Sequence, residues 1–135
     1  MHLTEAGEQG SGCPSVLLVE GDDFIRGTVG EFLIRQGYLV IAARDAGEAL
    51  RLARQARHVD ALVTDIAIPG MSGRQLARRI ANVVAPSRVL YISGFTGDLL
   101  FHPAPLDGPS TLVHNPFSFR ALTERLRELL ARPER

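Results

Sequence analysis

The sequence predicts an α/β domain with a five-stranded parallel sheet, and two observations carry that prediction. Short apolar runs alternate along the chain with stretches of helical periodicity, and this alternation is typical of parallel sheets with right-handed crossovers. The length of 135 residues and the hydrophobic fraction of 45% suit one globular domain of ordinary size.

Five apolar runs are predicted to be strands. The first, Val16-Leu17-Leu18-Val19, has no polar alternation, which is typical of a strand buried on both faces. The run before Asp65 has the same character and is stopped by Pro69, Gly70 and Gly73. The predicted strands span residues 16–19, 38–43, 61–64, 88–92 and 111–113.

Helical spacing fills most of the connections between these strands. In the first helix, either Asp22 or Asp23 caps the start, and Gly37 supplies a left-handed stop. The second helix opens at Asp45, and the third ends before Pro86. Their apolar positions are Ile25, Val29, Phe32 and Leu33, then Ala49, Leu50, Ala53 and Ala56, and then Leu76, Ala77 and Ile80.

The last two connections differ from each other. Between Gly97 and Pro109 the prolines at 103, 105 and 109 disfavour a helix, since an internal proline costs about 3 kcal/mol or more. We therefore expect the fourth helix to be short or disrupted, with at most a helical turn at 98–102. Ser118 caps a final helix whose apolar stripe is predicted to be core and not an interface. The stripe comprises Phe119, Leu122, Leu126, Leu129 and Leu130.

Composition excludes several classes of function. The 15 basic residues, all arginine, balance 15 acidic ones, so no general footprint for nucleic acid or an anionic membrane is present. The sequence shows no apolar run near the ~20 residues of a membrane span and no signal-peptide pattern, and we expect a cytoplasmic protein. Residues 1–14, with the single cysteine Cys13, are predicted to be a flexible tail, and residues 15–132 the folded domain.

Polar residues follow four of the predicted strands. Taken alone, Asp65 before a Pro-Gly turn is most simply an Asx turn. A parallel sheet, however, brings these strand ends to one edge, where open α/β sheets bind ligands. An acidic pair with oxygen-rich neighbours suits a hard cation such as Mg²⁺. The converging residues are Glu20, Asp65, Ser93 and Asn115.

From Ser15 to Leu130 the sequence resembles the receiver domains of two-component response regulators. The matching motifs are Val16 to Asp22, Asp65 through Gly73, Ser93-Gly94, and Asn115-Pro116-Phe117. The resemblance implies a flavodoxin-like, doubly wound sheet in the order 2-1-3-4-5, with helices on both faces and Glu20 beside Asp65.

The resemblance also implies a function. Asp65 would take a phosphoryl group from a phosphohistidine of a histidine kinase or phosphotransfer protein. Mg²⁺ would be held by Asp65, the main-chain carbonyl of Ala67 and the acidic pocket at Glu20. Ser93 would move toward the phosphoryl group and couple the chemistry to a downstream protein target. By the same resemblance, the chain is expected to be a signalling domain and not a classical enzyme, and to be a monomer or weak homodimer. The Asn115-Pro116 peptide bond is expected to be cis.

Three positions depart from the family pattern. Gly21 replaces the second acid after the first strand, which predicts weak Mg²⁺ binding. Asn115 replaces the lysine of the last loop, and the chain contains no lysine that could substitute for it. Leu112 stands where an aromatic switch residue is common.

These departures leave an alternative function open. A degenerate receiver would act as a phosphorylation-independent protein-interaction module. A flavodoxin-like cofactor binder fits poorly, because no hydroxyl-rich phosphate loop follows the first strand.

Overall fold

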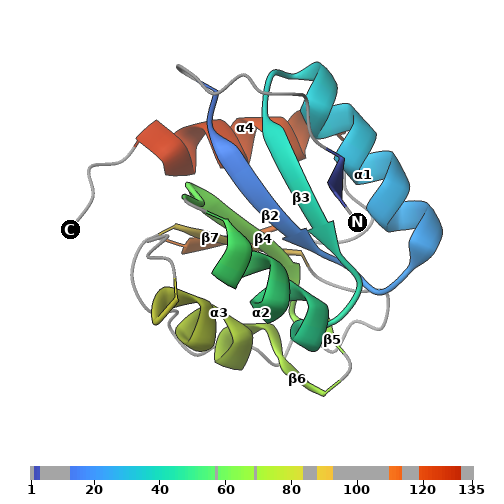
Figure 1. The fold of residues 1–135 in the computed structure, drawn as a ribbon. Coiled ribbons are helices and arrows are strands. Elements are labelled where there is room, and N and C mark those ends of the chain that lie inside the picture. Colours follow the sequence, from blue (N-terminus) through green and yellow to red (C-terminus); the bar gives the residue numbers. More distant parts are fainter. Residues whose placement is uncertain are drawn as a thin grey trace.

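The structure is a computed structural model that describes residues 2–3, 13–56, 58–68, 70–83, 88–92, 110–113 and 119–131. A central sheet is covered by helices on both sides (Figure 1). The strands are β1 (His2–Leu3), β2 (Ser15–Val19), β3 (Leu39–Ala43), β4 (Ala61–Asp65), β5 (Ala67–Ile68), β6 (Met71–Ser72), β7 (Val89–Ile92) and β8 (Ser110–Val113). The helices are α1 (Asp23–Arg35), α2 (Ala46–Gln55), α3 (Gly73–Ala81) and α4 (Phe119–Ala131).

The main sheet has the strand order β1-β3-β2-β4-β7-β8. The five strands β3, β2, β4, β7 and β8 are parallel to one another. Counted along the chain, they are the second, first, third, fourth and fifth parallel strands, which confirms the expected order 2-1-3-4-5. In the centre, Leu17 of β2 lies between Ile41 of β3 and Leu62 of β4. The chain reverses its direction of winding between β2 and β4, so the carboxyl ends of these two strands flank the crevice at the switch point.

A sixth strand corrects the sequence prediction at the amino terminus. His2 and Leu3 pair antiparallel with Ile41 and Val40 of β3. These two residues belong to the segment predicted to be a flexible tail, and the sheet edge they cover is that of β3. Residues 4–12 of the same segment lie outside the described residues.

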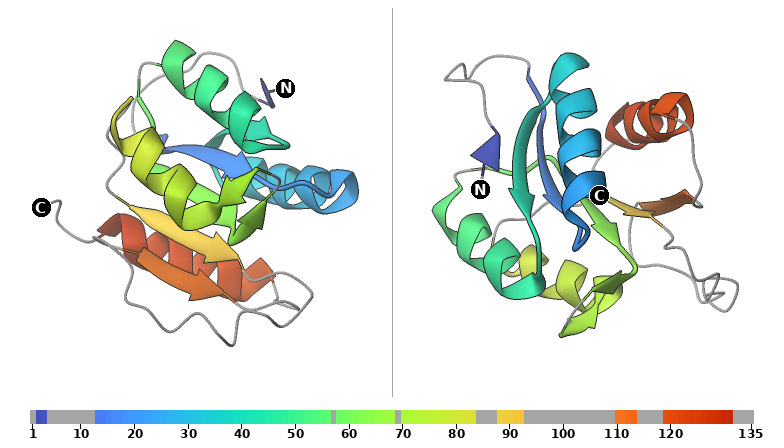
Figure 2. Two further views of the ribbon diagram at one scale, coloured as in Figure 1. Left: turned by 90° about the horizontal axis from the view of Figure 1, so that it is seen from below. Right: turned by 90° about the vertical axis from the view of Figure 1, so that its right-hand side faces the viewer.

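Two separate apolar clusters hold the helices to the sheet. On one face, Leu52 of α2 and Leu76 of α3 pack on side chains such as Leu17 and Leu62. On the other face, Leu33 of α1 and Leu126 of α4 pack on the opposite side of the same strands. Figure 2 shows the two helix layers on either side of the sheet. Leu122, Leu126 and Leu129 are fully buried, which confirms the predicted core position of these three residues of the α4 stripe.

Local capping signals start and stop the helices. Asp22, one of the two predicted candidates, caps α1 by accepting a hydrogen bond from the Ile25 amide at 2.9 Å. After α1, Gly37 adopts the predicted left-handed conformation with φ 101°. Asp45 caps α2 by accepting from the Glu48 amide at 2.8 Å.

The segment after Asp65, predicted from its sequence only as a turn, is a short hairpin. Ala67 of β5 pairs with Ser72 of β6, and Ile68 pairs with Met71. Gly70 provides the bend with φ 93°, a conformation that favours glycine. Ser72 then opens α3 with a capping box, in which its side chain and that of Gln75 each accept from the other's backbone amide.

Some predictions fall on segments that the structure does not describe. The disrupted fourth helix at 97–109, the cap at Ser118 and the Asn115-Pro116 peptide lie outside the described residues. Within the described ranges, no helix combines the length and apolar character needed to cross a bilayer.

Candidate functional site

Asp65 ends β4, the central strand next to β2. It pairs in register with Ile92, the last residue of β7, and its side chain is half-buried. The next residue, Ile66, is held by hydrogen bonds at both its amide and its carbonyl. Its amide donates to the Ile92 carbonyl at 3.1 Å, and its carbonyl accepts from the Gly73 amide at 2.7 Å. Asp65 is therefore a carboxylate on a rigid strand end at the sheet edge where ligands are expected.

Glu20 directly follows β2 and lies at the same edge. Its backbone amide donates to the Ala43 carbonyl at 3.0 Å, which continues the β2–β3 ladder by one residue. The side chain is only 6% exposed, and its Oε2 accepts a hydrogen bond from the Asp22 amide at 3.0 Å. Val19 of β2 pairs in register with Thr64 of β4, so the buried Glu20 and the half-buried Asp65 stand at the ends of neighbouring strands.

The electrostatics of Glu20 reflect that proximity. Burial raises the pKa of the Glu20 carboxyl above its ordinary value of 4.5, and the negative charges of Asp65 and Asp22 raise it further. The Asp22 amide and the Arg26 guanidinium act in the opposite direction. Asp65 is therefore close enough for its charge to disfavour ionisation of Glu20, which is the arrangement that a bound cation relieves.

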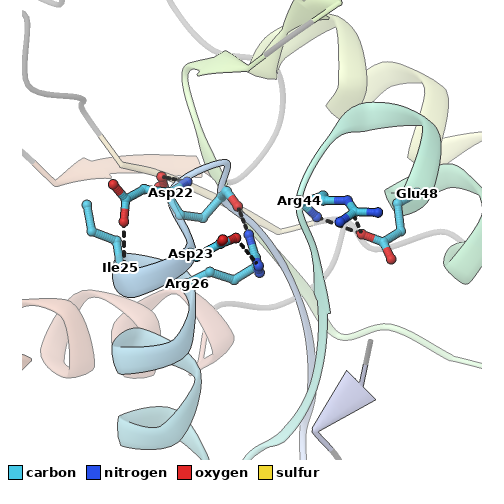
Figure 3. Close-up of polar contacts among 7 residues, drawn as sticks. Asp22, Asp23, Ile25, Arg26, Arg44 and Glu48 are labelled. Carbon is cyan, nitrogen blue, oxygen red and sulfur yellow. Dashed lines mark hydrogen bonds and ion pairs between the residues drawn. The ribbon is translucent and has the colours of Figure 1, made fainter.

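Asp22 and Arg26 both contact Glu20. Figure 3 shows these two residues together with Asp23 at the start of α1. The Asp22 carboxylate is exposed, and its Oδ1 caps α1 by accepting a hydrogen bond from the Ile25 amide. Arg26 donates from Nη1 to the Glu20 carbonyl at 3.0 Å and from Nη2 to Oδ1 of Asp23 at 2.6 Å. Sequence reasoning did not assign Arg26 to the site; its spacing three residues after Asp23 was the available signal.

Gly73 is a second residue that the sequence analysis did not place against Asp65. A Cβ at this position would lie 2.5 Å from the Asp65 carbonyl oxygen and 3.2 Å from the Ile66 Cα. Only glycine permits α3 to begin this close to the end of β4, because both neighbours are backbone atoms. The sequence predicts Gly73 only as a strand stop. Its close approach to the backbone of Asp65 and Ile66 is a tertiary contact that the sequence pattern does not show.

The donor set fits Mg²⁺ with few protein ligands. Glu20 and Asp65 supply two carboxylates, and Ala67 follows Asp65 by two residues in β5. Over the described ranges, no cluster of three or more histidine, cysteine, aspartate or glutamate side chains is positioned to hold a metal. Mg²⁺ commonly uses one or two carboxylates together with water and phosphate oxygens, so two carboxylates are sufficient for it but not for an all-protein cage.

The remaining predicted site residues lie outside the described residues. Ser93 comes directly after Ile92, the end of β7, and Asn115 comes two residues after Val113, the end of β8. Because β4, β7 and β8 are parallel neighbours, the chain leaves both strands at the edge where Asp65 lies. Leu112 pairs with Tyr91 in the backbone register.

Comparisons with known proteins agree on one family. The family model of the response regulator receiver domain matches residues 16–127. The sensor kinase CckA of Brucella abortus is 30% identical over 125 residues, 92% of this chain and 13% of that kinase. The transcriptional regulatory protein AfsQ1 of Streptomyces coelicolor is 33% identical over 122 residues, 90% of this chain and 53% of that regulator. The chain thus spans about half, or much less, of these relatives.

A solved structure is similar over most of both chains. The crystal structure of the receiver domain from the hybrid histidine kinase CckA aligns with a TM-score of 0.71 at 28% identity, covering 86% of this chain and 98% of that one. The parallel order of the sheet, the acidic pair at its switch point and the family match over most of the sequence give the same result. The chain belongs to the response regulator receiver domain family of two-component systems.

Proposed function

We propose that the chain accepts a phosphoryl group on Asp65 and relays it as a conformational signal. The observation that carries this proposal is the placement of Asp65 beside the buried Glu20, where the charge of Asp65 raises the pKa of Glu20. Two carboxylates placed together away from water are unfavourable unless a cation neutralises them. Such a pair at a sheet edge suits phosphoryl transfer assisted by a divalent ion.

The nucleophile for the transfer would be the Asp65 carboxylate. An ionised Asp65 oxygen attacks the phosphorus of a phosphohistidine, in line with the bond to the imidazole nitrogen. The new P–O bond forms as the P–N bond breaks, and the bonding electrons return to the imidazole nitrogen of the donor. The hydrogen bonds from Ile66 to Ile92 and from Gly73 to Ile66 hold the backbone of Asp65 for this attack.

Glu20, Asp65 and the main-chain carbonyl of Ala67 are the groups that would hold Mg²⁺. When bound, the ion supplies positive charge to the transferring phosphoryl oxygens. Gly21 removes one carboxylate from this set, so we expect weak Mg²⁺ affinity. Ser93 and Asn115 would donate hydrogen bonds to the phosphoryl oxygens, and a neutral donor such as Asn115 contributes about 1 kcal/mol where a charged one contributes about 1.5 to 3.

The proposed phosphoryl donor is a histidine kinase or a histidine phosphotransfer protein, and the proposed reader is a downstream protein. Receiver domains are signalling domains and not classical enzymes, so catalysis would extend at most to phosphorylation and dephosphorylation of Asp65 itself. Nucleic acid is not a proposed partner, because the formal net charge of the chain is zero.

Phosphorylation of the purified chain tests this function. The protein is incubated with Mg²⁺ and phosphoramidate, a small donor with a P–N bond, and the mass gain of one phosphoryl group is followed by intact mass spectrometry. We expect slow labelling of the wild type, none of Asp65→Asn, and unchanged labelling of Glu31→Gln, which removes an exposed carboxylate from α1.

A double variant separates this function from the alternative. Gly21→Asp with Asn115→Lys restores the acid and the cation of the family pattern, and we expect it to be labelled faster and at lower Mg²⁺ concentration. Labelling of the double variant with no labelling of the wild type would refute the proposal. The chain would then be a phosphorylation-independent interaction module.

A further inference from the structure

The charged residues of the helices are unevenly divided between the two faces of the sheet. Helices α2 and α3, which share one face, carry five arginines and one glutamate. Helices α1 and α4, on the other face, carry five arginines and four acidic residues. The formal net charge of zero therefore conceals a basic α2–α3 layer. The arginines of this layer are Arg51, Arg54, Arg74, Arg78 and Arg79.

A surface depression lies at the β6–α3 end of that layer. It is lined by Gly70, Met71, Gln75, Arg78 and Arg79. Gln75, Arg78 and Arg79 are exposed, whereas Met71 is half-buried and packs against the apolar cluster of the α2–α3 face. The lining of the depression thus combines two arginines and a glutamine with the side chain of Met71.

We propose that the β6–α3 depression is a docking surface for an acidic segment of a protein partner, with one apolar side chain of that segment seated beside Met71. Charge complementarity supports this occupant, because α3 contains three arginines and no acidic residue. Guanidinium groups pair with carboxylates through two parallel hydrogen bonds, and a methionine adapts its shape to an incoming apolar group.

The same observations favour a protein over a nucleic acid. Nucleic-acid-binding domains combine a basic stripe with a high isoelectric point, whereas this chain has a sequence pI of about 6.9. Arginine and methionine are enriched in protein interfaces. The depression also includes Gly70 and Met71 of the hairpin that follows Asp65, but docking requires no phosphoryl group and is independent of the proposed chemistry.

The test uses the unphosphorylated full chain and a defined probe. A short synthetic peptide of glutamate and aspartate around one central leucine is titrated into ¹⁵N-labelled protein, and amide chemical shifts are followed by NMR. We expect shifts concentrated at Gly70, Met71, Gln75, Arg78 and Arg79. The variant Arg78→Glu with Arg79→Glu is expected to weaken binding by about tenfold or more, since each reversed charge opposes the peptide. Replacing the leucine of the peptide by serine is expected to weaken it severalfold.

A matched variant controls for overall charge. Arg120→Glu with Arg127→Glu reverses the same number of exposed charges on α4 and is expected to change the affinity by less than about twofold. Equal weakening by the two double variants would overturn the proposal, as would shifts spread over both faces. Tighter binding of a DNA duplex than of the peptide to this depression at the same salt concentration would also overturn it.

Discussion

Replacing Gly73 by alanine places a methyl group against the backbone that carries Asp65. The new Cβ would lie 2.5 Å from the Asp65 carbonyl oxygen and 3.3 Å from Cγ2 of Thr64. Carbon–oxygen contacts rarely approach closer than about 3.3 Å, so the overlap with the carbonyl is roughly 0.8 Å. Relief requires movement of α3 or of the end of β4, because the obstructing atom is backbone held in a parallel sheet.

The cost follows from two opposing effects. Overpacking of this kind costs about 1 to 3 kcal/mol. Exchange of glycine for alanine within a helix returns about 0.5 to 1 kcal/mol. We therefore expect Gly73→Ala to lower the free energy of unfolding by up to about 2.5 kcal/mol. It should also slow phosphorylation, since a displacement near 1 Å at a reacting group lowers rates by up to about 100-fold.

Urea unfolding followed by circular dichroism measures the stability effect. Gly27→Ala in α1 is the matched control, because a Cβ there would meet nothing within 4 Å. That control is expected to gain about 0.5 to 1 kcal/mol. If Gly73→Ala proves as stable as Gly27→Ala, the close approach of α3 to the end of β4 does not restrict this position, and the reasoning fails.

Three further predictions concern Glu20 and the two residues that contact it, Asp22 and Arg26. Glu20→Gln is expected to raise the free energy of unfolding near neutral pH, because the raised pKa of Glu20 means that its ionised form opposes folding. The gain should shrink as the pH falls through that pKa toward 4.5. A gain that does not change with pH would contradict the raised pKa of Glu20. Asp22→Ala should cost about 1 kcal/mol through loss of the α1 cap, without changing Mg²⁺ affinity in a calorimetric titration; a large loss of that affinity would make Asp22 a metal ligand. Arg26→Gln should raise the pKa of Glu20 further by removing a positive charge, as read from an NMR titration of its carboxyl, and an unchanged pKa would exclude that role.

The apolar runs of the sequence predicted the strands of the parallel sheet well, because each is short and bounded by a clear stop. The order of the strands came from the resemblance to receiver domains. Val16 to Val19 and the run before Asp65 are completely buried up to their polar ends, as their lack of alternation indicated. Capping chemistry predicted the start of α2 at Asp45 and narrowed the start of α1 to Asp22 or Asp23, of which Asp22 is the cap. Strand runs and helix caps depend on residues that are close together in the chain, so a single sequence is enough to predict them.

The features that sequence reasoning missed depend on tertiary contacts or on very short elements. His2–Leu3 is too short to show periodicity, and its pairing with β3 depends on where the open edge lies. The strands of the Ala67–Ile68 and Met71–Ser72 hairpin are also too short to show periodicity. The spacing of Ser72 and Gln75 is a capping-box signal that the sequence does contain. The contacts of Gly73 and Arg26 join segments whose approach only the folded chain defines.

The most direct measurement for the central claim is the site and stoichiometry of phosphorylation in the wild-type chain. The protein is treated with Mg²⁺ and phosphoramidate, and borohydride then reduces any aspartyl phosphate to a stable homoserine that peptide mass spectrometry locates. Our account predicts a single modified residue, Asp65, with labelling that depends on Mg²⁺ and is lost in Glu20→Gln. Absence of label at Asp65 at saturating Mg²⁺, in a chain that is folded by circular dichroism, would contradict it.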